Sequence, residues 1–72
     1  MKATYDKEAD AMYIRVQKGK VHKTLHVSDA VLVDVDKKGQ ALGVELLFVS
    51  SHMPRKSIAQ TIRGGIPVAT TT

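Results

Sequence analysis

Apolar residues recur at every second position through much of residues 1–50, and this spacing constrains the fold more than any other feature. In "AMYIRV", Met12, Ile14 and Val16 fall on one face of an extended chain. The same alternation continues in "VHKTLHV", residues 21–27, and in "AVLVDV", residues 30–35. Period-two spacing gives a strand one apolar face, so the sequence predicts a protein built mainly of β-strands.

Glycine-containing turns separate these segments, and the spacing changes after Met53. "QKGK" and "DKKG", which contain Gly19 and Gly39, each predict a hairpin turn. In "MPRKSIAQTIRGG", Ile58 and Ile62 lie four residues apart after a proline, which is typical of a short amphipathic helix.

We therefore predict an α+β, mostly β fold: an antiparallel sheet of four to five strands in meander order, with one C-terminal helix that covers a face. The strands are expected at residues 2–5, 11–16, 21–27, 31–35 and 40–48. The chain should form one domain, with a sheet core at 1–50, the helix at 51–65 and a flexible tail at 66–72.

The last predicted strand is apolar on both faces. Leu42, Val44, Leu46 and Phe48 fill one face, and only Glu45 interrupts the apolar residues of the other. Such a strand is central in its sheet, or lies between a helix and another subunit. The pattern leads us to expect a homo-oligomer, a dimer or higher. Glu45 either lies on an open face or near a cationic or tyrosine partner, or it belongs to a site that raises its pKa.

Composition restricts the class of protein. The chain has no Cys, so a disulfide framework and thiolate metal sites are excluded, and a cytoplasmic location fits. The longest apolar run, Leu46–Val49, is too short to span a bilayer, and we expect no membrane association.

Several patterns that suggest metal or nucleophilic chemistry fail on spacing. "DVDKKG" resembles the start of a calcium loop, but Lys38 occupies a ligand position. His22 and His26 would lie about 13 Å apart on a strand, too far to share a zinc ion. There is no "GxSxG" motif for a serine nucleophile. We expect no metal and no cofactor, and the sequence gives no support for an enzyme.

The stretch "YDKEADAMYI", residues 5–14, places Asp6, Glu8 and Asp10 at alternate positions. It is compatible with a metal-binding loop, with paired catalytic carboxylates, or with the turn of a hairpin. Turn chemistry is favoured: Asp6 would begin the turn and Asp10 would lead into the strand at Ala11.

These motifs also resemble a prokaryotic family, domain-of-unknown-function family 2283. "YDKEADAMYIRV" and "SDAVLVDVDKKGQALGVELL" occur in the family's order, and the residues on its pattern are Tyr5, Asp6, Asp10, Tyr13, Asp34, Asp36, Gly39, Gly43 and Glu45. The resemblance implies a mostly β fold and a cytoplasmic prokaryotic source, and it implies no activity. The candidate functional cluster is Tyr5, Asp6, Asp10, Tyr13 and Glu45.

Three functional hypotheses follow. The first is a non-enzymatic, homo-oligomeric module that binds protein, such as an antitoxin-like regulator. The second is a nucleic-acid-associated protein, suggested by the net charge of +4. Its contacts would be Lys18, Lys20, Lys23, Arg55, Lys56 and Arg63. The third is a carboxylate-based enzyme with its site at a subunit interface.

Overall fold

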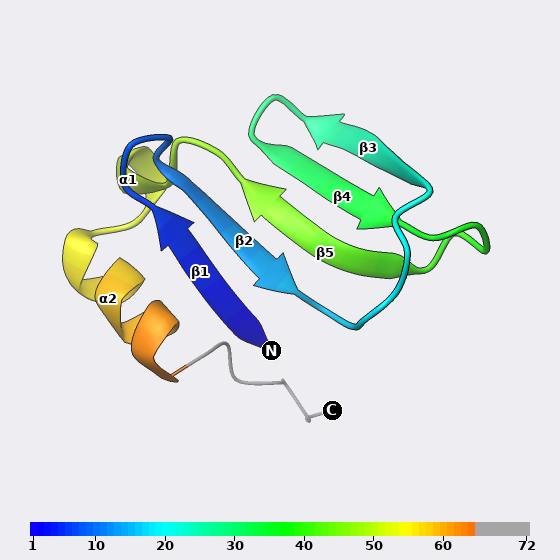
Figure 1. Ribbon diagram of the computed structural model, residues 1–72. Coiled ribbons are helices and arrows are strands. Elements are labelled where there is room, and N and C mark those ends of the chain that lie inside the picture. Colours follow the sequence, from blue (N-terminus) through cyan, green and yellow to red (C-terminus); the bar gives the residue numbers. More distant parts are fainter. Residues whose placement is uncertain (65–72) are drawn as a thin grey trace, which may run out of the picture.

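A computed structural model describes residues 1–64 and shows one five-stranded sheet followed by two helices (Figure 1). The predicted α+β, mostly β class is confirmed. The elements are β1 (Lys2–Asp6), β2 (Ala11–Arg15), β3 (Lys23–Ser28), β4 (Val31–Val35), β5 (Ala41–Leu46), α1 (Val49–His52) and α2 (Arg55–Gly64). The predicted tail at 66–72 lies outside the described residues.

All neighbouring strands are antiparallel, in the order β1-β2-β5-β4-β3. The expected meander order is therefore wrong, because β2 pairs with β5 and not with β3. The two-sided apolar strand, β5, takes the central position, where both of its edges are paired.

The segment expected to form a hairpin at Gly19 is instead a connection that carries the chain past the end of β5 to the far edge. The backbone N–H groups of Val16 and Gln17 donate to the Leu42 carbonyl at 2.9 and 3.3 Å. A Cβ at Gly19 would lie 2.6 Å from the Leu42 side chain, so glycine allows this close passage.

Strand register gathers apolar residues in rows across one face of the sheet, here called the apolar face. One row crosses every strand: Ala3, Ile14, Val44, Val33 and Leu25. A second row contains Tyr5, Met12, Leu46 and Val31. The opposite face, here called the polar face, presents the row Thr4, Tyr13, Glu45, Leu32 and His26.

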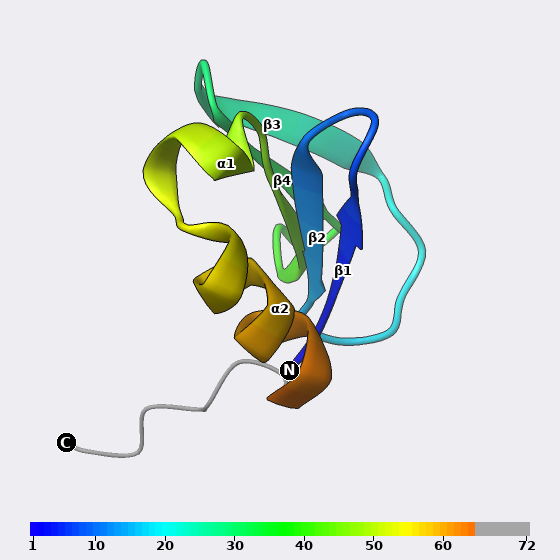
Figure 2. The same ribbon diagram turned by 90° about the vertical axis from the view of Figure 1, so that its left-hand side faces the viewer.

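Both helices lie on the apolar side, and α2 packs beside β1 at one edge (Figure 2). The buried cluster beneath the helices consists of Ala3 and Met12 from the sheet with Val49 and Ile58 from the helices. At the other edge every residue of β3 is exposed. The helical layer thus covers one part of the apolar face.

The C-terminal helix predicted at 51–65 is present as α2, and a short additional helix, α1, precedes it. Met53 adopts an extended conformation, with φ −143° and ψ 129°, and ends α1. Pro54 follows it, and the residue before a proline disfavours helical geometry. α1 is therefore a separate four-residue turn of helix.

Candidate functional site

The sheet separates the predicted cluster into three places. Tyr5 pairs with Met12 and lies on the apolar face beside α2, whereas Tyr13 and Glu45 are paired on the polar face. Asp6 ends β1, and Asp10 precedes β2. The five residues therefore do not converge on one site.

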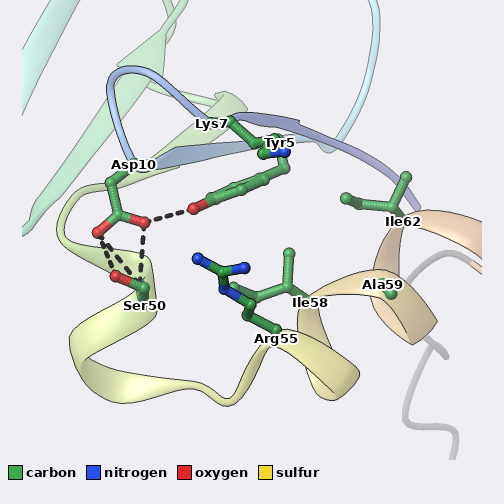
Figure 3. Close-up of a pocket in the computed structure, with 8 residues that line it drawn as sticks. All are labelled: Tyr5, Lys7, Asp10, Ser50, Arg55, Ile58, Ala59 and Ile62. Atoms are coloured by element: carbon green, nitrogen blue, oxygen red, sulfur yellow. Dashed lines mark hydrogen bonds between the residues drawn. The ribbon is translucent and has the colours of Figure 1, made fainter.

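Asp10 is the centre of the most connected polar group in the described chain (Figure 3). The Tyr5 hydroxyl donates to Asp10 Oδ1 at 2.5 Å. The Ser50 hydroxyl donates to Asp10 Oδ2 at 2.7 Å, and the Ser50 N–H donates to Oδ1 at 3.0 Å. The Asp10 backbone carbonyl accepts from the Val49 N–H at 3.0 Å.

These bonds make Asp10 a cap for α1 supplied by a distant part of the chain. Phe48, the residue that precedes α1, has φ 53° and makes no side-chain cap hydrogen bond. The first N–H groups of a helix lack intrahelical acceptors, and a carboxylate there also interacts favourably with the helix dipole. Asp10 itself has φ 52°, a left-handed conformation that Asp tolerates better than most residues.

The hydrogen bonds change the pKa of both the Asp10 carboxyl and the Tyr5 hydroxyl. The Tyr5 and Ser50 hydroxyls stabilise the Asp10 carboxylate and lower its pKa. The same bond to Asp10, with partial burial, raises the pKa of Tyr5. At neutral pH Asp10 is therefore a charged acceptor and Tyr5 a protonated donor, which favours a stable structural hydrogen bond.

Asp6 has the role that turn chemistry predicts. Its Oδ1 accepts from the backbone N–H groups of Glu8 and Ala9 at 3.0 and 3.2 Å. Asp36 does the same in the next acidic motif, accepting from Lys38 and Gln40, both at 2.9 Å. The turn interpretation of Asp6 is confirmed.

A second polar group lies on the polar face. The Tyr13 hydroxyl donates to Asp34 Oδ2 at 3.0 Å, and the Thr24 hydroxyl donates to Asp34 Oδ1 at 2.5 Å. Burial and the Asp34 hydrogen bond raise the pKa of Tyr13. Sequence reasoning left Thr24 and Asp34 out of the candidate cluster. Alternation does place Asp34 opposite the apolar face, but the strand order is needed to bring it near Tyr13.

The Tyr13 ring packs directly against the backbone of Gly43. A Cβ at Gly43 would lie 1.9 Å from the Tyr13 hydroxyl oxygen. The ring crosses this position on its way from β2 to Asp34 on β4, so glycine is required where β5 passes below. Glu45 lies next along the same face, half-buried between Tyr13 and Leu32 of its neighbouring strands.

The basic residues of the nucleic-acid hypothesis are distributed over separate places. Lys23 begins β3 at one edge of the sheet, while α2, which carries Arg55, Lys56 and Arg63, packs beside β1 at the other. Lys18 and Lys20 lie in the connection between β2 and β3. This placement does not form one basic surface.

Residues 1–64 contain no group of three or more His, Asp or Glu side chains arranged to hold a metal ion. They also contain no helix with the length and apolar character needed to cross a membrane.

Fold and site together define a small α+β protein in which an acidic turn ties an antiparallel sheet to a short helical layer. Residues 2–50 match the model of a family described as "Protein of unknown function (DUF2283)", and the chain belongs to that family. The resemblance noted from the sequence is thereby confirmed. No curated protein and no solved structure matches the chain.

Replacing Asp10 tests its role as a charged cap. Asp10→Asn keeps one acceptor but cannot accept from both hydroxyls, so we expect the melting temperature at pH 7 to fall by roughly 5 °C. The folded-state pKa of Asp10 is lowered. Its contribution is therefore present above the unfolded-state pKa of about 4 and is lost as pH falls through the lower folded-state value. The melting difference between wild type and variant should shrink over that acidic range.

Asp29→Asn is the matched control, because Asp29 is exposed and makes no side-chain hydrogen bond among residues 1–64. It should melt like the wild type at both pH values. A melting difference for Asp10→Asn that stays constant down to pH values well below the unfolded-state pKa would contradict a charged cap.

A double-mutant cycle tests the contact between Gly43 and Tyr13. Gly43→Ala should destabilise the wild type by about 1–3 kcal/mol, because the new methyl group displaces the Tyr13 ring. In a Tyr13→Ala background the clash is absent, and the same change should be neutral or stabilising by up to about 1 kcal/mol. Urea denaturation of the four proteins gives both values, and equal effects in both backgrounds would refute the contact.

Proposed function

We propose that this protein is a non-enzymatic protein-binding module that associates with a second copy of itself through the β3 edge of its sheet. The observation that supports this most strongly is the exposure of apolar side chains on β3. Leu25 is 41% exposed and Val27 is 64% exposed, in a strand that has no buried residue. A regulatory, antitoxin-like role is the functional class that such a module fits.

Edge strands of natural proteins usually do not combine an unpaired backbone edge with exposed apolar side chains. An unpaired edge presents free backbone donors and acceptors, and proteins protect such edges with charges, prolines, bulges or a covering element. Here the protection is limited to Lys23 and to a bulge between His26 and Ser28. Between them the strand offers Leu25 beside the half-buried Val33 of β4.

The sequence of β3 suits pairing with an identical strand. If two copies meet antiparallel about Leu25, the two Leu25 residues are opposite each other, and each Lys23 is opposite Val27. No like charges then face one another across the junction. The interface is isologous, so one two-fold axis closes a dimer and leaves no further edge at β3.

Sedimentation and light scattering test the proposal. The wild type should be a dimer, and Leu25→Lys with Val27→Lys should be a folded monomer, because the new cation at position 25 meets its own copy and the one at position 27 meets Lys23 of the other copy. The chain carries a net charge of +4, so wild-type association should strengthen as salt is added. Nucleic-acid binding would weaken under the same change.

Ile62→Lys is the matched control, since Ile62 is 42% exposed but lies on α2, near the opposite edge. It should remain dimeric, and circular dichroism should show a folded sheet for each variant. A wild type that stays monomeric at its highest soluble concentration, or a Leu25→Lys, Val27→Lys variant that stays dimeric, would refute this interface.

A further inference from the structure

A cavity of about 520 Å³ lies between β1 and α2, next to the Tyr5–Asp10–Ser50 group (Figure 3). Its α2 wall is apolar and is formed by Ile58, Ala59 and Ile62. Its volume lies within the range of pockets that bind small organic molecules. The cavity is distinct from the β3 edge, because β1 and β3 are the two opposite edges of the sheet.

Two cations stand at the cavity. Arg55 extends from α2 toward the Tyr5 ring, and Lys7 lies on the strand side (Figure 3). Both are exposed, and neither has a carboxylate partner within residues 1–64. Asp10, the nearby carboxylate, forms no ion pair with either cation, and its two oxygens accept from Tyr5 and Ser50.

The apolar wall and the two unpaired cations together restrict the class of ligand that the cavity can bind. A small inorganic anion would meet the cations but leave the wall of Ile58, Ala59 and Ile62 unused. A neutral apolar molecule would cover that wall but leave the cations without a partner. A carboxylate can accept paired hydrogen bonds from the planar guanidinium of Arg55, while an alkyl or aromatic body packs against the isoleucines.

We propose that this cavity binds a small monocarboxylate with an apolar body, of the size of a medium-chain fatty acid. Its carboxylate pairs with Arg55, and its chain lies along Ile58 and Ile62. The bound molecule contacts both β1 and α2, so it also stabilises the docking of α2 on the sheet.

Titrations followed by backbone amide chemical shifts test this, with sodium octanoate, 1-octanol and sodium acetate as probes. Octanoate should bind saturably, with its largest shifts at Tyr5, Ser50 and Ile62. Octanol lacks the charge and acetate lacks the chain, so each should bind at least about fivefold more weakly. The thermal transition should rise with octanoate concentration.

Matched charge variants on α2 locate the carboxylate. Arg55→Gln should weaken octanoate binding roughly fivefold, whereas Lys56→Gln, which removes the same charge from the neighbouring residue outside the cavity, should leave it unchanged. Equal loss in both variants would show attraction by net charge only and would overturn the site. Octanol binding as tightly as octanoate, or shifts that do not saturate or that centre on Leu25 and Val27, would overturn it as well.

Discussion

The carboxylate of Asp10 joins the first hairpin of the chain to α1, whose Ser50 is 40 residues away in sequence. It accepts from Tyr5 on β1 and from Ser50 on α1, and its own residue forms the turn into β2. α1 has only four residues and is too short to be stable by itself, so it needs contacts with the rest of the protein. The bonds to Asp10 supply that connection, and the position of the helical layer follows from it.

The small core depends on the same connection. Two of the four buried residues in the cluster beneath the helices, Val49 and Ile58, come from the helices themselves, and Val49 is adjacent to Ser50. When Ser50 is bound to Asp10, Val49 is placed over Met12, which is 1% exposed. The layer extends over β1 but leaves the β3 edge uncovered, and that division between a closed and an open part of one apolar face motivates the proposed dimer. It also creates the cavity beside α2, where the layer meets the first strand.

Sequence alone predicted the strands well and their arrangement poorly. All five strands were expected, four of them from alternation, and β4 lies at the predicted residues 31–35. The two-sided apolar pattern of β5 indicated a central strand, but alternation does not identify neighbouring strands, so the pairing of β5 with β2 was missed. α1 was missed because its four residues are too few to show a helical period, and its cap comes from Asp10 rather than from its own sequence.

The candidate site was predicted in part for the same reason. Tyr5 and Asp10 were recognised from the family pattern, and they do bind each other. Their partner Ser50 is 40 residues from Asp10, and no local pattern connects the two. Tyr13 and Glu45, grouped with them by sequence, lie on the opposite face, where Tyr13 binds Asp34 across β5. Turn geometry explains Asp6 and Asp36, and the close passage of the Tyr13 ring explains Gly43.

Asp10 thus connects the helical layer to a sheet that can persist without that layer. Native-state hydrogen exchange of Asp10→Ala measures this directly, because it reports the opening of each element separately. In this variant the amides of α1 and α2 should lose protection by more than about tenfold, while those of β4 and β5 keep theirs. Equal loss of protection in helices and central strands, or unchanged protection in α1, would contradict it.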